Sequence, residues 1–194
     1  MDEHESDRLL SPMHPNDVPD GYPRDLERWV DLPGGEPVYI RPILPGDVAR
    51  LEYAFAHADV QTVRSRFFTA APPTDRAHLL YLTTVDYRMR LALIAMDETG
   101  TSIGIGRYEG GAEIVGEGAA EVAIVVAPTW RRKGVGAALL LALEAPALAH
   151  GISTFSALYL PSNTGVERLL LSIGYTGRTA ADGIATLIKP LGGG

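Results

Sequence analysis

Hydrophobic and polar positions follow two different periods along this chain, and the period predicts which element each segment forms. Short β-branched and apolar runs bounded by Gly, Pro or Asp predict strands at residues 38–43, 90–97, 102–109, 119–128, 153–160 and 184–189. Apolar positions three and four residues apart predict helices at residues 45–58, 60–68, 75–85, 134–150 and 163–174. Glu98, Thr99 and Gly100 mark the turn of a β-hairpin. This order of elements indicates a mixed α/β (α+β) domain around one sheet.

The two ends of the chain differ from this patterned body. Residues 1–36 are rich in Pro, Asp and Glu, which predicts a partly disordered N-terminal arm, with Trp29 and Val30 docking on the body. The predicted domain then covers residues 37–190. Residues 191–194 read Leu-Gly-Gly-Gly and resemble a linker, which leaves room for an additional domain beyond them.

Composition narrows the class of protein further. The chain has 194 residues, 46% of them hydrophobic and 21% charged, which is typical of a globular protein. Its formal net charge of −7 argues against nucleic-acid or anionic-membrane partners. The absence of cysteine excludes disulfides and thiolate metal ligands, and we expect no metal. The N-terminus lacks the apolar core of a secretory signal, and the run Val135–Leu143 is too short to span a bilayer, so we expect a cytoplasmic protein.

A local excess of positive charge stands out in this acidic chain. Arg131, Arg132 and Lys133 immediately precede Gly134 and Gly136, at the start of a predicted helix. Cations at a helix N-terminus oppose the helix dipole unless an anion lies between them, so the pattern favours a phosphate-binding loop. The residue order fits neither a P-loop nor a dinucleotide-binding fingerprint. A solvated basic turn remains the structural alternative.

Two spaced motifs carry a resemblance to a known family. Arg131-x-x-Gly134-x-Gly136 follows a strand ending "IVVAP", and Asn163 is followed at family spacing by Leu169 and Gly174-Tyr175. Together they resemble the motifs of the GNAT acyltransferase superfamily, over residues 38–189. The resemblance implies a central mixed, mostly antiparallel sheet with a splay between two strands, flanked by helices. It also implies acetyl-CoA as cosubstrate.

The same resemblance implies which residues hold that cosubstrate. Strand residues before the loop would hydrogen-bond the pantetheine arm, the loop would hold the pyrophosphate, and an asparagine would contact the pantetheine from the far side. In this order the positions are Ile124, Val125 and Val126; Arg131, Arg132, Lys133, Gly134, Val135, Gly136 and Ala137; and Asn163.

Glu121 is the candidate general base for acetyl transfer to an amine. An ammonium must lose a proton before it can attack, and Glu121 is the ionisable residue in the apolar strand "AAEVAIVV". Apolar neighbours are expected to raise its pKa, which suits a base. The alternative is a solvated glutamate at a strand edge. Many family members place a tyrosine acid after the motif leucine, but here the residue is Leu170, with Tyr159 and Tyr175 as weaker substitutes.

The first half of the chain resembles the bacterial protein-lysine acetyltransferases, usually called Pat, in "IRPILPGD", "RSRFF" and "LTTVDYRMRLALIA". Such enzymes acetylate the active-site lysine of AMP-forming acyl-CoA synthetases, so a protein substrate of that class is the expected partner. Its candidate contacts are Arg64, Arg66, Phe67, Phe68 and Asp86. One alternative is acetylation of a small amine, bound by Asp86, Glu113 and Glu117. A non-catalytic acyl-CoA-sensing module is the other.

Overall fold

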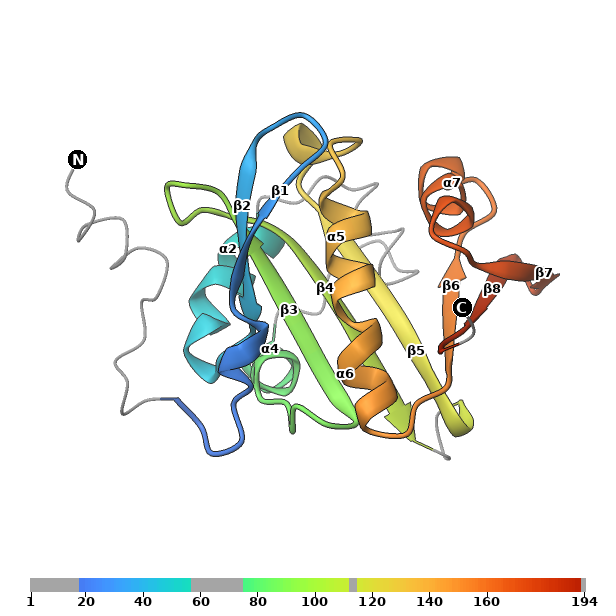
Figure 1. The fold of residues 1–194 in the computed structure, drawn as a ribbon, viewed down its shortest axis with the longest axis horizontal. Helices are drawn as coiled ribbons and strands as arrows, with labels where there is room; N and C mark the ends of the chain where they lie inside the picture. The colour runs from blue at the N-terminus through green and yellow to red at the C-terminus, as the bar shows by residue number, and fades with distance from the viewer. Residues whose placement is uncertain (1–17, 57–74, 112–114, 193–194) are drawn as a thin grey trace.

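The computed structural model describes residues 18–56, 75–111 and 115–192, and these build an eight-stranded sheet with helices on both faces (Figure 1). The strands are β1 (Arg28–Asp31), β2 (Pro37–Pro42), β3 (Arg90–Met96), β4 (Ser102–Gly111), β5 (Gly116–Val126), β6 (Thr154–Tyr159), β7 (Thr176–Ala181) and β8 (Ile184–Pro190). Their order in the sheet is β1-β2-β3-β4-β5-β6-β8-β7. All neighbours are antiparallel except β5 and β6, which run parallel. The expected mixed, mostly antiparallel sheet is confirmed.

Helices cover the two faces of the sheet. On one face lie α5 (Val135–Ala142) and α6 (Glu144–Ala149), and on the other lie α2 (Val48–Ala56) and α4 (Arg76–Thr83) (Figure 1). Helix α7 (Thr164–Ser172) follows β6, and short 3-10 turns occur at η2 (Arg24–Leu26), η3 (Pro45–Asp47) and η4 (Pro128–Trp130). No helix in the described residues is long and apolar enough to cross a membrane.

A hydrophobic core lies on each side of the sheet. The larger one joins the sheet to α5, α6 and α7, with Tyr108, Leu139 and Phe155 among its fully buried members. The smaller one joins the sheet to α2 and α4 through Leu51, Leu79 and neighbouring apolar side chains. Successive strand residues point to opposite faces, so the same strands serve both cores.

The structure differs from the sequence prediction near the N-terminus. Residues 28–31, within the predicted arm, form β1 and pair antiparallel with β2 from Arg28–Ile40 to Asp31–Pro37. Tyr22 and Leu32 are buried in the larger core, and the Trp29 ring lies 5.4 Å from the ring of Tyr39. The sheet therefore begins before residue 37. Residues 1–17 lie outside the described part of the chain.

Two further elements also differ. The predicted helix at 134–150 is two helices that meet at Leu143, because Pro146 has no N–H to donate to the carbonyl of Ala142. Strand β7 was not predicted, because its sequence TGRTAA is exposed throughout and has no alternation of apolar residues. The predicted helix at 60–68 lies outside the described residues.

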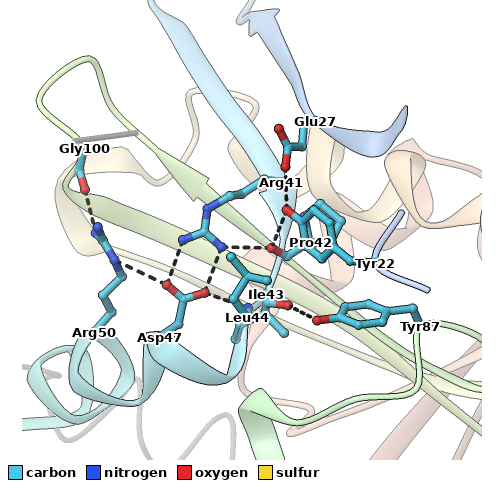
Figure 2. Close-up of polar contacts among 10 residues, drawn as sticks. All are labelled: Tyr22, Glu27, Arg41, Pro42, Ile43, Leu44, Asp47, Arg50, Tyr87 and Gly100. Atoms are coloured by element: carbon cyan, nitrogen blue, oxygen red, sulfur yellow. Dashed lines mark hydrogen bonds and ion pairs between the residues drawn. The ribbon is translucent and has the colours of Figure 1, made fainter. Parts of the chain in front are cut away.

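A buried ion pair anchors the junction of β2 and α2 (Figure 2). Arg41 donates from Nη1 and Nη2 to the Asp47 carboxylate at 2.8 and 2.7 Å, and the two side chains are only 1% and 2% exposed. Burial alone would lower the pKa of Arg41, but the hydrogen bonds and charge of Asp47 outweigh burial and raise it. Nearby, Tyr87 donates to the carbonyl of Ile43 at 2.9 Å, and burial raises the pKa of its phenol to about 12. Hydrogen bonding inside the core thus holds the start of α2 to the sheet.

Candidate active site

The two parallel strands at the centre of the sheet separate part-way along their length. Their pairing ends at Val122, opposite Ala157, although β5 continues to Val126 and β6 to Tyr159. Figure 1 shows β5 and β6 diverging, with α5 beside β5 and α7 beside β6. Residues 123–126 therefore have β4 on one side and, among the described residues, no paired strand on the other. This is the splay that the sequence motifs imply.

The direction of the backbone groups along this open edge follows from one hydrogen bond. The N–H of Ala127 donates to the carbonyl of Ile103 at 2.8 Å, so Ala127 faces β4. In an antiparallel pair, alternate residues face the partner strand, so Val125 also faces β4. The N–H and C=O groups of Ile124 and Val126 then point into the gap. Val125, grouped with them in the sequence prediction, uses its backbone groups within the sheet instead.

The basic glycine loop lies between the end of β5 and the start of α5. Gly134 is the N-cap residue with a φ of 101°, a left-handed conformation that glycine adopts without steric cost, and no side chain caps the helix there. Arg132, exposed to solvent, also has a positive φ, of 63°. The first amides of the helix, at residues 135–137, have no partner within the helix, because intrahelical bonds start with the Ala138–Gly134 bond at 2.9 Å. This N-terminus suits an anion.

Two contacts join α5 to α7 beside the gap. A Cβ on Gly136 would lie 2.9 Å from Cδ2 of Leu169, so a larger residue here would displace the Leu169 side chain. The motif residue Asn163 is the N-cap of α7, where its Oδ1 accepts from the N–H of Val166 at 3.2 Å. The two motifs predicted from the sequence are therefore brought together across the splay.

Two of the three cations of the loop, Arg131 and Lys133, have partners within the protein. Lys133 donates from Nζ to Oε1 of Glu36 at 2.8 Å, and the same Nζ lies 4.6 Å from the centre of the Trp130 ring. Arg131 donates from Nε to the carbonyl of Val126 at 3.2 Å. The first contact links the loop to the β1–β2 connection, far away in sequence.

Glu121 lies at the closed end of the splay. Its neighbour Val122 points into the larger core, so Glu121 points to the opposite face of the sheet, where α2 and α4 lie. The Glu121 side chain is half-buried. Glu121 comes one residue before Val122, where the pairing of β5 with β6 ends. A side chain at this point can reach a group held where the strands begin to separate.

A second carboxylate, which sequence reasoning missed, stands directly beside Glu121. Glu109 on β4 is its register partner, and such side chains point to the same face about 5 Å apart at Cβ. Glu109 accepts from the hydroxyl of Tyr81 on α4, and its Oε1 lies 3.3 Å from Nε of Arg90. The Arg90 guanidinium also stacks 3.8 Å over the ring of Tyr81. The hydrogen bond from Tyr81 to Glu109, together with burial, raises the pKa of Tyr81. Glu109 meets Glu121 only through the register of β4 and β5, so no local sequence motif could have indicated it.

The structure describes two of the other candidate acceptor contacts, Asp86 and Glu117. Asp86 accepts from the backbone N–H groups of Arg88 and Arg90, both at 2.8 Å, and so stabilises its own loop. Glu117 is exposed near the start of β5, about 13 Å along the strand from Glu121. The other candidates lie outside the described residues: Arg64, Arg66, Phe67, Phe68 and Glu113.

The two tyrosines that could replace the missing acid, Tyr159 and Tyr175, differ in their surroundings. Leu170 is buried in the larger core. Tyr159 donates its hydroxyl to Oε1 of Glu167 at 2.8 Å, while Tyr175 is buried and its hydroxyl has no hydrogen-bond partner among the described residues. Burial raises the pKa of Tyr159 and of Tyr175. Among the described residues there is also no group of three or more His, Asp or Glu side chains placed to hold a metal ion.

Comparison with known proteins agrees with this geometry. Residues 57–175 match the Acetyltransferase (GNAT) family. The chain is 32% identical over 149 residues to Acetyltransferase Pat of Mycolicibacterium smegmatis, an alignment that covers 75% of this chain and 43% of Pat. This chain thus spans less than half the length of that relative.

Solved structures give the same result. The GNAT domain of S. lividans PAT is 31% identical, with a TM-score of 0.79 over 88% of this chain and 99% of that domain. A cAMP-binding acyltransferase from Mycobacterium smegmatis is 26% identical, with a TM-score of 0.60 over 85% of this chain and 47% of that protein. The fold and the split sheet are those of the GNAT class. The chain belongs to the GNAT acetyltransferase family and is similar to Pat, and this family uses acetyl-CoA.

Proposed function

We propose that this protein transfers an acetyl group from acetyl-CoA to the ε-amino group of a lysine in a protein substrate, such as an AMP-forming acyl-CoA synthetase. The observation that carries the proposal is the end of β5–β6 pairing at Val122, beside the carboxylate of Glu121 and below the basic glycine loop. Similarity to Pat supports a protein lysine as acceptor.

The described residues fit acetyl-CoA as cosubstrate. Ile124 directs its N–H and C=O into the gap and Val126 its N–H, so an extended pantetheine arm can pair there like an added strand, while the carbonyl of Val126 accepts from Arg131. The amides of residues 135–137 and the cations before them suit the pyrophosphate. Asn163 would contact the pantetheine from the α7 side. When bound, acetyl-CoA supplies the acetyl thioester.

Glu121 would act as the general base. A lysine ammonium has an ordinary pKa near 10.4, so almost none of it is neutral at pH 7. The Glu121 carboxylate accepts the proton, directly or through a water, and the neutral nitrogen then attacks the acetyl carbon. The charge that develops on the carbonyl oxygen would meet the N–H of Ile124 or Val126. The C–N bond forms first, and the C–S bond then breaks as the carbonyl reforms. The nitrogen loses its second proton to water, and water protonates the thiolate, whose pKa is low enough to leave without an acid.

The test is transfer of label from radiolabelled acetyl-CoA to a purified acetyl-CoA synthetase. Label on the active-site lysine of the synthetase supports the proposal. Glu121→Gln should keep CoA binding but lose at least about 100-fold in turnover. Glu117→Gln is the matched control, because it removes the same charge from the same strand without approaching the splay, and its turnover should stay at the wild-type level.

Other outcomes would select another function. Label on small amines but not on protein would favour the small-amine acetyltransferase. Binding of acetyl-CoA without transfer to any amine would favour an acyl-CoA-sensing module. An unchanged rate in Glu121→Gln would remove this residue from the mechanism.

A further inference from the structure

The β1–β2 connection lies directly against the predicted phosphate loop. A Cβ on Gly134 would lie 2.7 Å from Cδ of Pro33, so this connection packs on the backbone at the start of α5. Three residues after Pro33, the Glu36 carboxylate binds Lys133 at 2.8 Å. A negative side chain from the N-terminal hairpin is therefore held at a site where the loop would bind an anion.

The ion pair between Lys133 and Glu36 is weak enough for Lys133 to exchange Glu36 for another anion. The side chains are 38% and 45% exposed, and an ion pair so open to water is weak. Trp130 supports the ammonium from another side, through its ring face. Lys133 can therefore leave Glu36 without losing its position beside the loop.

We propose that Glu36 is an internal competitor for the phosphate groups of acetyl-CoA and sets the affinity of the site. In the free protein Glu36 neutralises Lys133. When the cosubstrate binds, a pyrophosphate oxygen takes the place of the carboxylate on Lys133, and the Glu36 side chain turns to solvent. This inference rests on the proposed acetyl-CoA site. It adds a residue of the N-terminal hairpin as an affinity determinant.

The experiment measures CoA binding by isothermal titration calorimetry, without turnover. Removing the competitor in Glu36→Gln should tighten CoA binding by about two- to fivefold, the range expected for a surface ion pair. The gain should be absent when Lys133→Gln is already present, because Glu36 acts through Lys133. Pantetheine, which lacks the phosphates, should bind equally to wild type and to Glu36→Gln. Asp31→Asn is the control: it removes the same charge from the same hairpin, at an exposed position, and should leave CoA affinity unchanged.

The outcomes separate this inference from the proposed function. Weaker or unchanged CoA binding in Glu36→Gln would show that the carboxylate supports the loop or has no role, and would overturn the inference while CoA binding by the wild type still stood. A gain that persists with Lys133→Gln, or that Asp31→Asn reproduces, would overturn it as well, because net charge alone would then be responsible. If wild-type protein binds no CoA, both the inference and the proposed acetyl-CoA site fail. Thermal melts of each variant would verify that affinities refer to folded protein.

Discussion

The buried pair of Arg41 and Asp47 offers a direct test of what holds the N-terminal half of the sheet together (Figure 2). The Asp47 carboxylate accepts two hydrogen bonds from Arg41 and one from the N–H of Leu44 at 2.8 Å, and it lies 3.4 Å from Nε of Arg50. Asp47→Ala would leave the Arg41 guanidinium, 1% exposed, without its counter-charge. Removing one partner of such a pair costs about 3–5 kcal/mol.

This loss is large against the total stability of a domain, about 5–15 kcal/mol. With a urea m-value of about 2 kcal/mol/M, a loss of about 4 kcal/mol lowers the midpoint by roughly 2 M. The assay is urea unfolding followed by far-UV circular dichroism. Arg178→Gln is the comparison variant, because it breaks the exposed ion pair between Arg178 and Glu167, and its midpoint should change far less.

A double variant distinguishes the buried charge from packing. Replacing both partners by apolar residues, Arg41→Met with Asp47→Leu, removes the charge together with its counter-charge, which is often neutral. The double variant also loses the hydrogen bonds to Leu44 and to the carbonyl of Pro42, about 1 kcal/mol each, together with the partly exposed ion pair to Arg50. It should still be more stable than Asp47→Ala, because no unpaired charge stays buried. A midpoint shift below about 0.5 M for Asp47→Ala, or a double variant as unstable as the single one, would refute the argument.

Three further predictions concern the site and its surroundings. Gly134→Val should weaken CoA binding in calorimetry and also lower the thermal midpoint, because a β-branched side chain would have to adopt a φ of 101° beside Pro33; an unchanged midpoint would contradict the observed packing. Glu109→Gln should lower the pKa of Tyr81 towards 10.0, since a carboxylate acceptor favours the protonated phenol. The measurement is an ultraviolet pH titration, in which subtracting the curve of Tyr81→Phe isolates the signal of Tyr81. Hydrogen bonds from Tyr159 and Arg178 lower the pKa of Glu167, so this carboxylate adds stability that is present above pH 4.5 and is lost as the pH falls through its lower folded pKa. The stability gap between wild type and Glu167→Gln should therefore close below pH 4.5 in urea unfolding, and a gap that widens would contradict it.

Much of the fold could be predicted from local pattern. Strands β2, β3, β4, β5, β6 and β8 lie where alternating or continuous apolar runs indicate them, because side-chain burial on one or both faces dictates that pattern. Strand β7 has exposed side chains only and so lacks the signal. Strand β1 is short and lies in a Pro- and Gly-rich segment, and its pairing with β2 stabilises it more than its own propensity does.

Some residues of the candidate site could be located from the sequence, and others only from the structure. The glycine loop and Asn163 could be located from the sequence, because each belongs to a short motif of residues close together in the chain. Glu109 could not, because it meets Glu121 only through the register of β4 and β5. The contact between Glu36 and Lys133 could not be predicted either, since the two residues lie 97 positions apart.

By itself, the sequence determined the order of most elements, the family motifs and the identity of Glu121 as the carboxylate in an apolar strand. Only the tertiary structure decided where β5 and β6 separate, which backbone groups face the gap and which carboxylates approach Glu121 and Lys133. The reason is physical. Periodicity and capping act between residues a few positions apart, whereas register, strand separation and ion pairs form between segments that meet only when the chain folds.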